Sequence, residues 1–433
     1  MTTPQVLTAA TICTSFPEMP QPTIARENLL VALETMLNGD LQMIILEGEE
    51  GVGKTTLLAQ FARRNSEHTV SVFIRPTSWY TSDPEILTSD LINQMNWIVS
   101  SKEIPSREAM GTALLRRSVY ELMRFSGRTS KKIVFVVDGL TAIPAERRFS
   151  RDAILELIPF GYPQFKFIFS GKSEELAGLK PLAHMVWKTF QVPPFSRDEA
   201  RALFGTEVSQ TFIDDIYSVC KGLPGYFATI QRLLKSGAKP EELATDLPTS
   251  LPQLFDLEWK TVDRSNSLQI EIVAFLAHDK NSHSLADLEV LFRHPQHDIT
   301  ASLKELSFVT IPANSTAPVQ FVSDAFRTYA AQQLSRESRV VVDRVVDSLL
   351  SQPESVVALK FLPTYLSETA RHQSLLEYLS PDRFERMLAM TEQLTPLQRT
   401  IELGFRTAQK LNKDEELFRF GVQSSTVAEL NGF

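Results

Sequence analysis

The spacing of apolar residues divides the chain into two regions of different pattern. In the first region, short apolar runs alternate with segments that have the periodicity of amphipathic helices. The runs lie at Met43–Leu46, Thr69–Arg75, Ile133–Val137 and Phe165–Phe169. Continuous runs of this kind are typical of strands that helices cover on both faces. Strands that alternate with helices up to about Phe190 therefore predict an open, doubly wound parallel α/β sheet.

The second region, beyond the predicted sheet, has mainly helical periodicity. Ser196, with Glu199 three residues later, forms a capping box that opens a helix. Two more helices are predicted before the next break, at Phe212–Cys220 and Tyr226–Leu234. Pro240–Pro252 is rich in proline and threonine, and we expect it to be a linker.

Three helices and two short strands follow the linker in the order that is typical of a winged-helix domain. The helices are Ile270–Leu276, Leu285–Phe292 and Ile299–Leu306, and the strands are Phe308–Ile311 and Val319–Val322. Such a domain binds DNA or packs against a neighbouring domain. We favour packing, because Lys304 is the only basic residue of the third helix. From Arg339 to Phe433 the pattern is helical throughout, which is compatible with a helical repeat array.

The segment between the first strand and the following helix carries a phosphate-binding signature. Gly48, Gly53, Lys54 and Thr55 fit the pattern G-x-x-x-x-G-K-[ST], and Gly51 lies within it. Glycines let the backbone turn tightly, so that successive N–H groups and the N-terminal end of the helix face a phosphate. We expect Lys54 to reach the β- and γ-phosphates and the Thr55 hydroxyl to hold Mg²⁺. A chance glycine-rich turn is the alternative, and the partner strand described next argues against it.

Two further strand ends carry polar residues that suit a nucleotide site. Ile133–Val137 delivers Asp138 to the carboxyl edge of the sheet, where a Walker B aspartate supports Mg²⁺. Phe165–Phe169 leads to Ser170 and Lys172, which fit either a sensor facing the γ-phosphate or a solvated turn. An aspartate after a single apolar strand is weak evidence alone, but together with the phosphate loop it indicates a nucleoside-triphosphate site.

Composition and charge narrow the class of protein. The chain has 433 residues, which suggests several domains, and its hydrophobic content of 43% is that of a globular protein. A formal net charge of -8 argues against a nucleic-acid-coated surface. Two cysteines, no apolar run of about 18 residues and no basic start of a signal peptide indicate a cytoplasmic protein without a membrane segment.

These patterns together predict five regions along the chain. They are an N-terminal leader that wraps over the surface or stays mobile (1–22), a P-loop NTPase domain (23–190), a helical lid (191–265), a winged helix (266–335) and a helical region (336–433). A helical array needs several units and a polar cap to be stable. One hypothesis is therefore that the chain is part of a longer protein.

The order of these parts resembles the STAND class of signal-transducing ATPases, which includes the NACHT and NB-ARC groups. Its signs are the phosphate loop, Asp138, the sensor strand, the Gly-x-Pro of the turn Gly222–Gly225 and the winged helix. Ile24–Glu27 also resembles the hhGRE signature of this class, with Ala25 in place of glycine. The resemblance covers roughly Thr23–Leu334.

The resemblance implies that ATP or ADP binds together with Mg²⁺. The residues it implies for the triphosphate are Gly48, Gly51, Val52, Gly53, Lys54, Thr55 and Thr56. Those it implies for the base pocket are Ile24, Arg26 and Pro224, which would pack on the adenine. The metal ligands would be Thr55 and Asp138, and the catalytic group would be Lys54, Asp138 and Lys172.

The chain departs from the family pattern at three positions. Thr141 stands where a second acidic residue is often found, and Glu146 lies five residues further on. Lys172 replaces the arginine that commonly follows the sensor strand, and a lysine offers a point charge without a bidentate fork. Ser323 stands where NACHT-type members have a winged-helix histidine. Because no obvious base remains to activate water, we predict tight nucleotide binding with slow hydrolysis.

The sequence therefore predicts an ATP-dependent switch that senses an unidentified trigger and forms homo-oligomers on activation. A role in bacterial defence or stress signalling rests on the resemblance alone. One alternative is an AAA+ ATPase of the Orc/Cdc6-like or transposition-helper type, which would act on DNA through the winged helix. Another is a scaffold that binds nucleotide without cycling. The acidic charge and the weakly basic third helix argue against a nucleic-acid partner.

Overall fold

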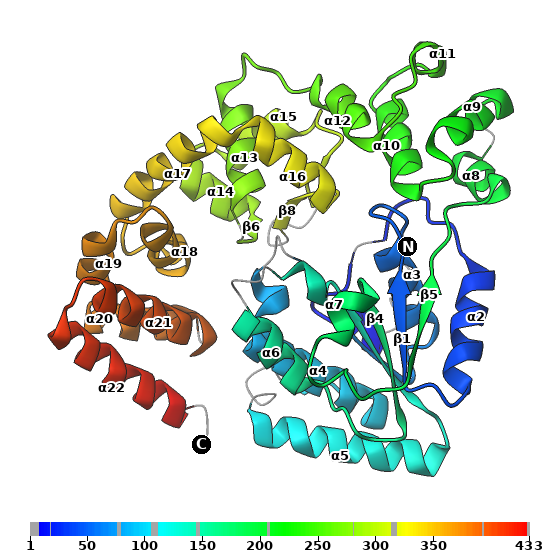
Figure 1. The fold of residues 1–433 in the computed structure, drawn as a ribbon. Helices are drawn as coiled ribbons and strands as arrows, with labels where there is room; N and C mark the ends of the chain where they lie inside the picture. The colour runs from blue at the N-terminus through cyan, green and yellow to red at the C-terminus, as the bar shows by residue number, and fades with distance from the viewer. Residues whose placement is uncertain are drawn as a thin grey trace. The chain divides into compact units, whose positions relative to one another are not determined.

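The computed structural model describes residues 8–17, 19–75, 79–104, 111–143, 148–205, 208–279, 281–312, 318–391 and 394–430. The chain divides into two compact units, Met1–Leu254 (unit 1) and Phe255–Phe433 (unit 2). Unit 1 contains a β-sheet with helices on both faces, and unit 2 is mainly helical (Figure 1). No helix among the described residues is both long and apolar enough to cross a bilayer.

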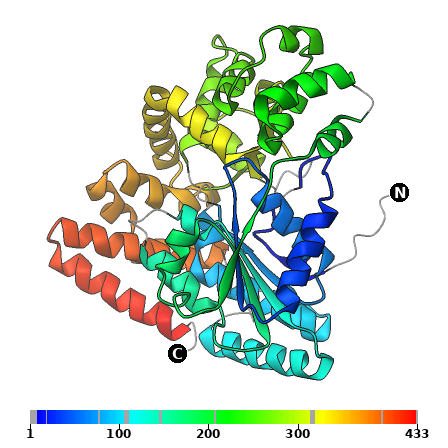
Figure 2. The same ribbon diagram turned by 45° about the vertical axis from the view of Figure 1, so that its right-hand side comes forward.

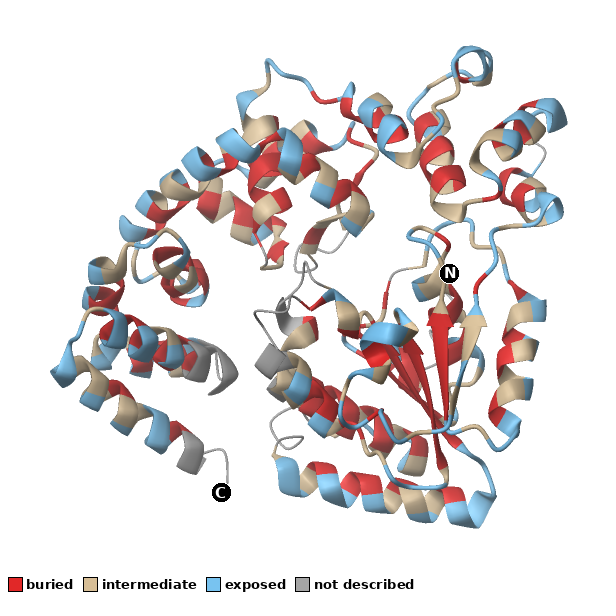
Figure 3. Ribbon diagram, viewed as in Figure 1, coloured by how far each residue is buried: buried red, intermediate tan, exposed pale blue. Residues whose placement is uncertain are grey.

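Five parallel strands form the sheet of unit 1, in the order β2-β3-β4-β1-β5. Their bounds are β1 Met43–Glu47, β2 Thr69–Phe73, β3 Ile133–Asp138, β4 Phe165–Ser170 and β5 Trp187–Gln191. The first four are the apolar runs of the sequence, so the predicted parallel sheet is confirmed. The sequence did not single out β5, because this edge strand is only partly buried and lacks a continuous apolar run (Figure 3).

Helices cover the sheet on both faces (Figure 2). One face carries α2 (Glu27–Asn38) and α3 (Lys54–Arg64), and the other carries α4 (Pro84–Ser100), α5 (Thr112–Thr129) and α6 (Arg148–Leu157). Alternate residues of β1 pack into the two cores, since Ile44 and Leu46 lie on the side of α3 while Met43 and Ile45 lie on the side of α4. Because these strands are buried on both faces, polar and apolar residues do not alternate along them.

The Ser-Gly dipeptide near the end of helix α5 does not interrupt it. The helix continues through Ser126 and Gly127 to Thr129. Ser130, with a φ of 57°, provides the left-handed residue that ends it. The Ser126 hydroxyl donates to the carbonyl of Lys131 at 2.5 Å and so joins the helix to the start of β3.

The short helix α1 (Ala9–Ile12) and the residues after it pack beside the edge strand β2. The backbone N–H of Ser71 donates to Gln94 Oε1 at 2.8 Å, and Gln94 Nε2 donates back to the Ser71 carbonyl at 2.9 Å. The N–H of Phe73 donates to the hydroxyl of Ser15 at 3.1 Å. Side chains thus satisfy backbone groups that a further strand would otherwise pair. Residues 8–17 of the predicted leader therefore pack against the sheet domain.

The remainder of unit 1 is helical. Its elements are the 3₁₀ helices η1 Trp79–Ser82 and η2 Leu140–Ala142, together with α7 Ser173–Ala177, α8 Arg197–Phe204, α9 Gln210–Cys220, α10 Pro224–Lys235 and α11 Pro240–Thr245. The predicted linker at Pro240–Pro252 is wrong, because it contains α11 and the start of α12 (Leu251–Trp259), within which unit 1 ends. Proline is compatible with both helices because it occupies their first turns, where its missing N–H is not needed.

Unit 2 begins with three helices and a small antiparallel sheet. The elements are α13 Ser267–His278, β6 His283–Ser284, α14 Leu285–Phe292, α15 Gln296–Leu303, β7 Val309–Thr310 and β8 Pro318–Phe321. The three helices and the two strands that the sequence predicted are present, with the strand order β6-β8-β7. The sequence did not predict β6, because a strand of two residues has no recognisable pattern.

The rest of unit 2 is helical throughout its described residues, as predicted. The helices are α16 Asp324–Gln333, α17 Ser335–Leu350, α18 Val356–Glu368, α19 His372–Tyr378, α20 Pro381–Thr391, α21 Leu394–Lys410 and α22 Asp414–Leu430. The last two helices pack closely where Gly404 meets Phe420, since a Cβ at position 404 would come within 2.5 Å of the Phe420 ring. This close approach makes α21 and α22 a tightly packed helical pair.

Candidate functional site

The phosphate loop joins β1 to α3, as the sequence predicted. Gly51 and Gly53 have φ angles of 81° and 90°, in the left-handed region that glycine adopts without strain. Gly53 is the N-cap of α3, so the helix begins at Lys54 and its first N–H groups lie at the end of the loop. Val52 is buried against the core, which anchors the loop to the domain. This geometry suits an anion at the helix N-terminus.

Lys54 lies over the loop that precedes it. Its ammonium group donates to the carbonyl of Gly48 at 2.7 Å and to the carbonyl of Glu49 at 3.0 Å. Burial lowers the pKa of Lys54, while the charges of Asp138 and Glu50 act in the opposite direction. A half-buried ammonium held by two carbonyls can move to a stronger acceptor, such as a phosphate oxygen, without a change in backbone conformation.

Asp138 is the centre of a small polar cluster at the carboxyl edge of the sheet. The hydroxyl of Thr55 donates to Asp138 Oδ2 at 2.6 Å, and the hydroxyl of Ser170 donates to Asp138 Oδ1. The Ser170 oxygen in turn accepts from the N–H of Gly139 at 3.1 Å. Because β4 lies between β3 and β1 in the sheet, Ser170 lies between the aspartate and the phosphate loop.

Burial raises the pKa of Asp138, although the hydrogen bonds from Ser170 and Thr55 and the charges of Lys54 and Arg75 act in the opposite direction. The positive charges near the carboxylate therefore do not fully offset the effect of burial on its pKa. A hydroxyl and a carboxylate 2.6 Å apart are the oxygen ligands that Mg²⁺ prefers, so Thr55 and Asp138 fit the metal that the phosphate loop implies.

The turn that contains Pro224 contacts the phosphate loop. The N–H of Gly225 donates to the carbonyl of Gly51 at 2.8 Å. A Cβ at Gly225 would lie 3.2 Å from the Cα of Gly51, so the two backbones approach closely. Pro224 is the first residue of α10, so the turn and the helix start directly beside the loop.

Ile24 and Arg26 lie beside the phosphate-loop helix. Gln60 of α3 donates through Nε2 to the carbonyl of Ile24 at 2.7 Å. The Arg26 side chain is only 7% exposed, and its Nη2 donates to the carbonyl of Pro194 at 2.9 Å. The segment after β5 also reaches the start of the loop, since the Val192 carbonyl lies 3.2 Å from the position of a Cβ at Gly48. The structure thus brings the predicted base-pocket residues and the predicted triphosphate residues into one region.

Lys172 and Thr141 are not part of this cluster. The side chain of Lys172 is 80% exposed and lies 3.7 Å from Glu175. Thr141 packs against Gly171, where an added Cβ would lie 2.9 Å from its methyl group. Ser323 belongs to unit 2, where its side chain caps α16. Glu146 lies outside the described residues.

Three residues near the site were missed in the sequence. Arg75 lies two residues after the end of β2, and the last residue of that strand, Phe73, is paired with Asp138. The available signal in the sequence was the position of Arg75 just after a strand. Glu199 was recognised only as part of a capping box, but it also forms an ion pair with Arg26 at 3.0 Å. Gln60 had no sequence signal, because its contact with Ile24 depends on tertiary packing.

No protein-family model and no curated protein matches the chain. Among solved structures, it is similar to a STAND protein with a tetratricopeptide repeat sensor from Pyrococcus horikoshii. The identity is 12% and the TM-score 0.50, over 96% of this chain and 66% of that chain. This chain therefore spans slightly less than two thirds of that protein's length.

Two further similarities are weaker. A Walker-type ATPase of Pyrococcus abyssi has 16% identity and a TM-score of 0.37, over 72% of this chain and 97% of that one. An Orc1 protein of Aeropyrum pernix, solved in complex with DNA, has 12% identity and a TM-score of 0.34, over 74% and 95%. TM-scores this low do not establish a common fold. The first similarity, together with the observed parallel sheet, shows that this chain shares the α/β P-loop fold of that STAND protein.

Proposed function

We propose that this protein is a nucleotide-dependent switch that binds ATP or ADP with Mg²⁺ and hydrolyses ATP slowly. The observation that carries the proposal is the cluster of Lys54, Thr55, Asp138 and Ser170 at one edge of the sheet. The loop and Lys54 bind the phosphates, and Thr55 and Asp138 hold the metal, which would neutralise phosphate charge when bound. Ile24, Arg26 and Pro224 receive the base.

Slow turnover follows from the residues around Asp138. Thr141 packs against Gly171 and offers a hydroxyl where a carboxylate base would be needed. Lys172 extends toward Glu175 and into solvent, so it supplies no charge to the cluster in this conformation. Such a site retains its nucleotide for long periods, which suits a switch better than a metabolic ATPase.

The proposed switch has the five regions that the sequence predicts, with a helical lid (191–265), a winged helix (266–335) and a C-terminal helical region (336–433). The close pairing of α21 and α22 at Gly404 supports a helical sensor of repeat type. Binding of an unidentified trigger there favours exchange of ADP for ATP, followed by homo-oligomerisation in the cytoplasm. A role in bacterial defence or stress signalling is part of this proposal.

Replacing Lys54 by alanine tests the proposal. We expect the affinity for ATP and ADP, measured by calorimetry, to fall by about 100-fold, because two charge-assisted hydrogen bonds to phosphate are lost. Lys188→Ala is the matched control, since Lys188 is an exposed residue of the edge strand β5. Equal binding by both variants would refute the phosphate-loop assignment, and a wild-type turnover above about one per second would refute the slow switch.

Duplex DNA provides the test between the switch and the DNA-acting alternative. Helix α15 carries no lysine or arginine within its bounds, and Lys304 follows its last residue. We expect no duplex binding by fluorescence anisotropy at moderate salt. Binding that weakens steeply as salt rises would instead support the alternative.

A further inference from the structure

Glu199 uses its two carboxylate oxygens for different purposes. Oε2 accepts from the backbone N–H of Ser196 at 2.7 Å, and the Ser196 hydroxyl accepts from the N–H of Glu199 at 3.1 Å. This reciprocal pair closes the capping box at the start of α8. Oε1 accepts from Arg26 Nε at 3.0 Å. One side chain therefore joins the start of α8 to a residue of the predicted base pocket.

Arg26 depends on Glu199 for its charge balance. Its side chain is 7% exposed, and Glu199 is the carboxylate that pairs with it among the described residues. The other contacts are neutral, namely the Pro194 carbonyl at 2.9 Å and the ring of Phe195, whose centroid lies 5.3 Å from the guanidinium carbon. A buried cation that loses its only paired anion is strongly disfavoured. Glu199 therefore determines where the guanidinium lies.

One nitrogen of the Arg26 guanidinium is available to a ligand. Its Nη1 is buried and has no hydrogen-bond partner among the described residues. Buried polar groups in native proteins are normally paired, so an unpaired donor here points to an acceptor that binds from outside the chain. Arg26 follows directly on the Ile24 segment that Gln60 of α3 holds, which places it beside the phosphate-loop helix.

We propose that Glu199 is a positioning residue of the nucleotide site, which fixes Arg26 so that its free N–H binds the nucleoside part of the bound nucleotide. This inference rests on the proposed nucleotide-binding function. It adds that the carboxylate of Glu199, which also caps α8, is the charged partner that holds this arginine. Loss of the negative charge of Glu199 therefore releases Arg26.

The variant Glu199→Gln tests this positioning role. The amide can still accept from Ser196, but it lacks the charge that holds Arg26. We expect the dissociation constant of ADP, measured by calorimetry, to rise about tenfold, as when one charge-assisted hydrogen bond is lost. Binding of inorganic tripolyphosphate should change by less than about twofold, because that probe has no nucleoside.

Ser196→Ala is the matched control. It removes the other half of the capping box but leaves the contact between Glu199 and Arg26. We expect faster hydrogen exchange at the start of α8, with ADP and tripolyphosphate binding both unchanged. This control separates the positioning of Arg26 from the stability of the helix.

Each outcome decides the inference. The inference is overturned if Glu199→Gln binds ADP as tightly as the wild type. It is also overturned if Glu199→Gln weakens the binding of ADP and of tripolyphosphate by the same factor, or if Ser196→Ala weakens ADP binding as much as Glu199→Gln does. A wild-type protein that binds neither probe would instead overturn the proposed nucleotide-binding function, and the inference with it.

Discussion

Two buried aspartates, one in each unit, show how differently the chain uses the same side chain. Asp138 at the end of β3 is 7% exposed, and Asp279 after α13 is 5% exposed. Burial raises the pKa of a carboxyl group in both places. The net result is opposite, since the pKa of Asp138 is raised above its ordinary value and that of Asp279 is lowered.

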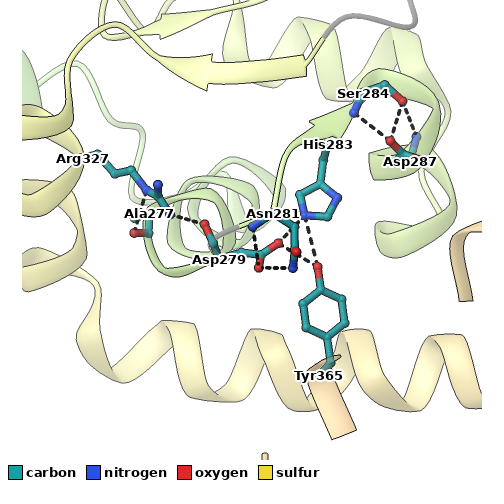
Figure 4. A network of polar contacts seen from close by, with 8 residues as sticks. All are labelled: Ala277, Asp279, Asn281, His283, Ser284, Asp287, Arg327 and Tyr365. Carbon is teal, nitrogen blue, oxygen red and sulfur yellow. Dashed lines mark hydrogen bonds and ion pairs between the residues drawn. The ribbon is translucent and has the colours of Figure 1, made fainter. Parts of the chain in front are cut away.

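The neighbours of Asp279 account for this difference (Figure 4). Tyr365 of α18 donates to Asp279 Oδ2 at 2.7 Å, and the His283 ring contacts the same oxygen. Asn281 donates to Oδ1 at 2.8 Å. Burial raises the pKa of Asp279, but the charge of His283 and these hydrogen bonds outweigh burial and lower it. Asp279 is therefore a fully paired group that joins the end of α13 to β6 and α18.

The surroundings of Asp138 leave part of its charge unbalanced. Its hydrogen-bond partners are the neutral hydroxyls of Thr55 and Ser170, and the charges of Lys54 and Arg75 have smaller effects than burial. Burial alone therefore does not distinguish a functional carboxylate from a structural one. The charge of the partners does, because only the under-compensated carboxylate gains from binding a cation.

The largest expected contrast comes from the same substitution at both positions. Asp279→Asn should lower the free energy of unfolding of unit 2 by about 3–5 kcal/mol, because the amide leaves a buried network with mismatched donors. Asp138→Asn should leave the stability of the unliganded protein within about 1 kcal/mol of the wild type or raise it, as is common at functional sites. Hydrogen exchange of peptides from α18 and β3 measures both. Equal destabilisation at the two positions would remove the distinction.

A smaller contrast is expected when one donor is removed from each cluster. Tyr365→Phe deletes a hydrogen bond to a buried charge, and we expect a loss of about 1.5–3 kcal/mol in unit 2. Ser170→Ala deletes a donor to Asp138 and an acceptor of Gly139 N–H, with an expected loss of about 1 kcal/mol. Urea unfolding compares the two variants. The comparison fails if Ser170→Ala is the more destabilising.

Acid should act on the two aspartates in opposite directions. The folded-state pKa of Asp279 lies below the ordinary 3.8, so its stabilising contribution is present above the unfolded pKa and is lost as pH falls through the folded pKa. The folded-state pKa of Asp138 lies above 3.8. Its stabilising contribution is therefore present below the unfolded pKa and is lost as pH rises through the folded pKa.

The measurement for this acid effect is hydrogen exchange of the unliganded protein over a series of acidic pH values, corrected for intrinsic rates. As the pH falls, protection in α18 should decrease more steeply in the wild type than in Asp279→Asn. In β3, acid should favour protection more in the wild type than in Asp138→Asn. Differences of the same sign at both positions would contradict the pKa shifts.

Local sequence signals predicted most of the sheet and the phosphate-binding part of the site. Four of the five strands were recognisable because they are apolar on both faces, and the loop from Gly48 to Thr55 was recognisable because phosphate binding needs glycines and a lysine at fixed spacing. The edge strand β5, the two-residue β6 and the helices within Pro240–Pro252 were missed. Each is short or partly exposed, so packing rather than pattern determines it.

The sequence by itself determined the class of fold, the phosphate loop and Asp138, because each depends on neighbours in the chain or on a regular period. Only the tertiary structure decided that Glu199 pairs with Arg26, that Lys172 is 80% exposed and that Asp279 is balanced by Tyr365. Arg26 and Glu199 are 173 residues apart in the chain, and Asp279 and Tyr365 are 86 residues apart. No local pattern encodes contacts over such distances, because they form only when the elements that carry them pack together.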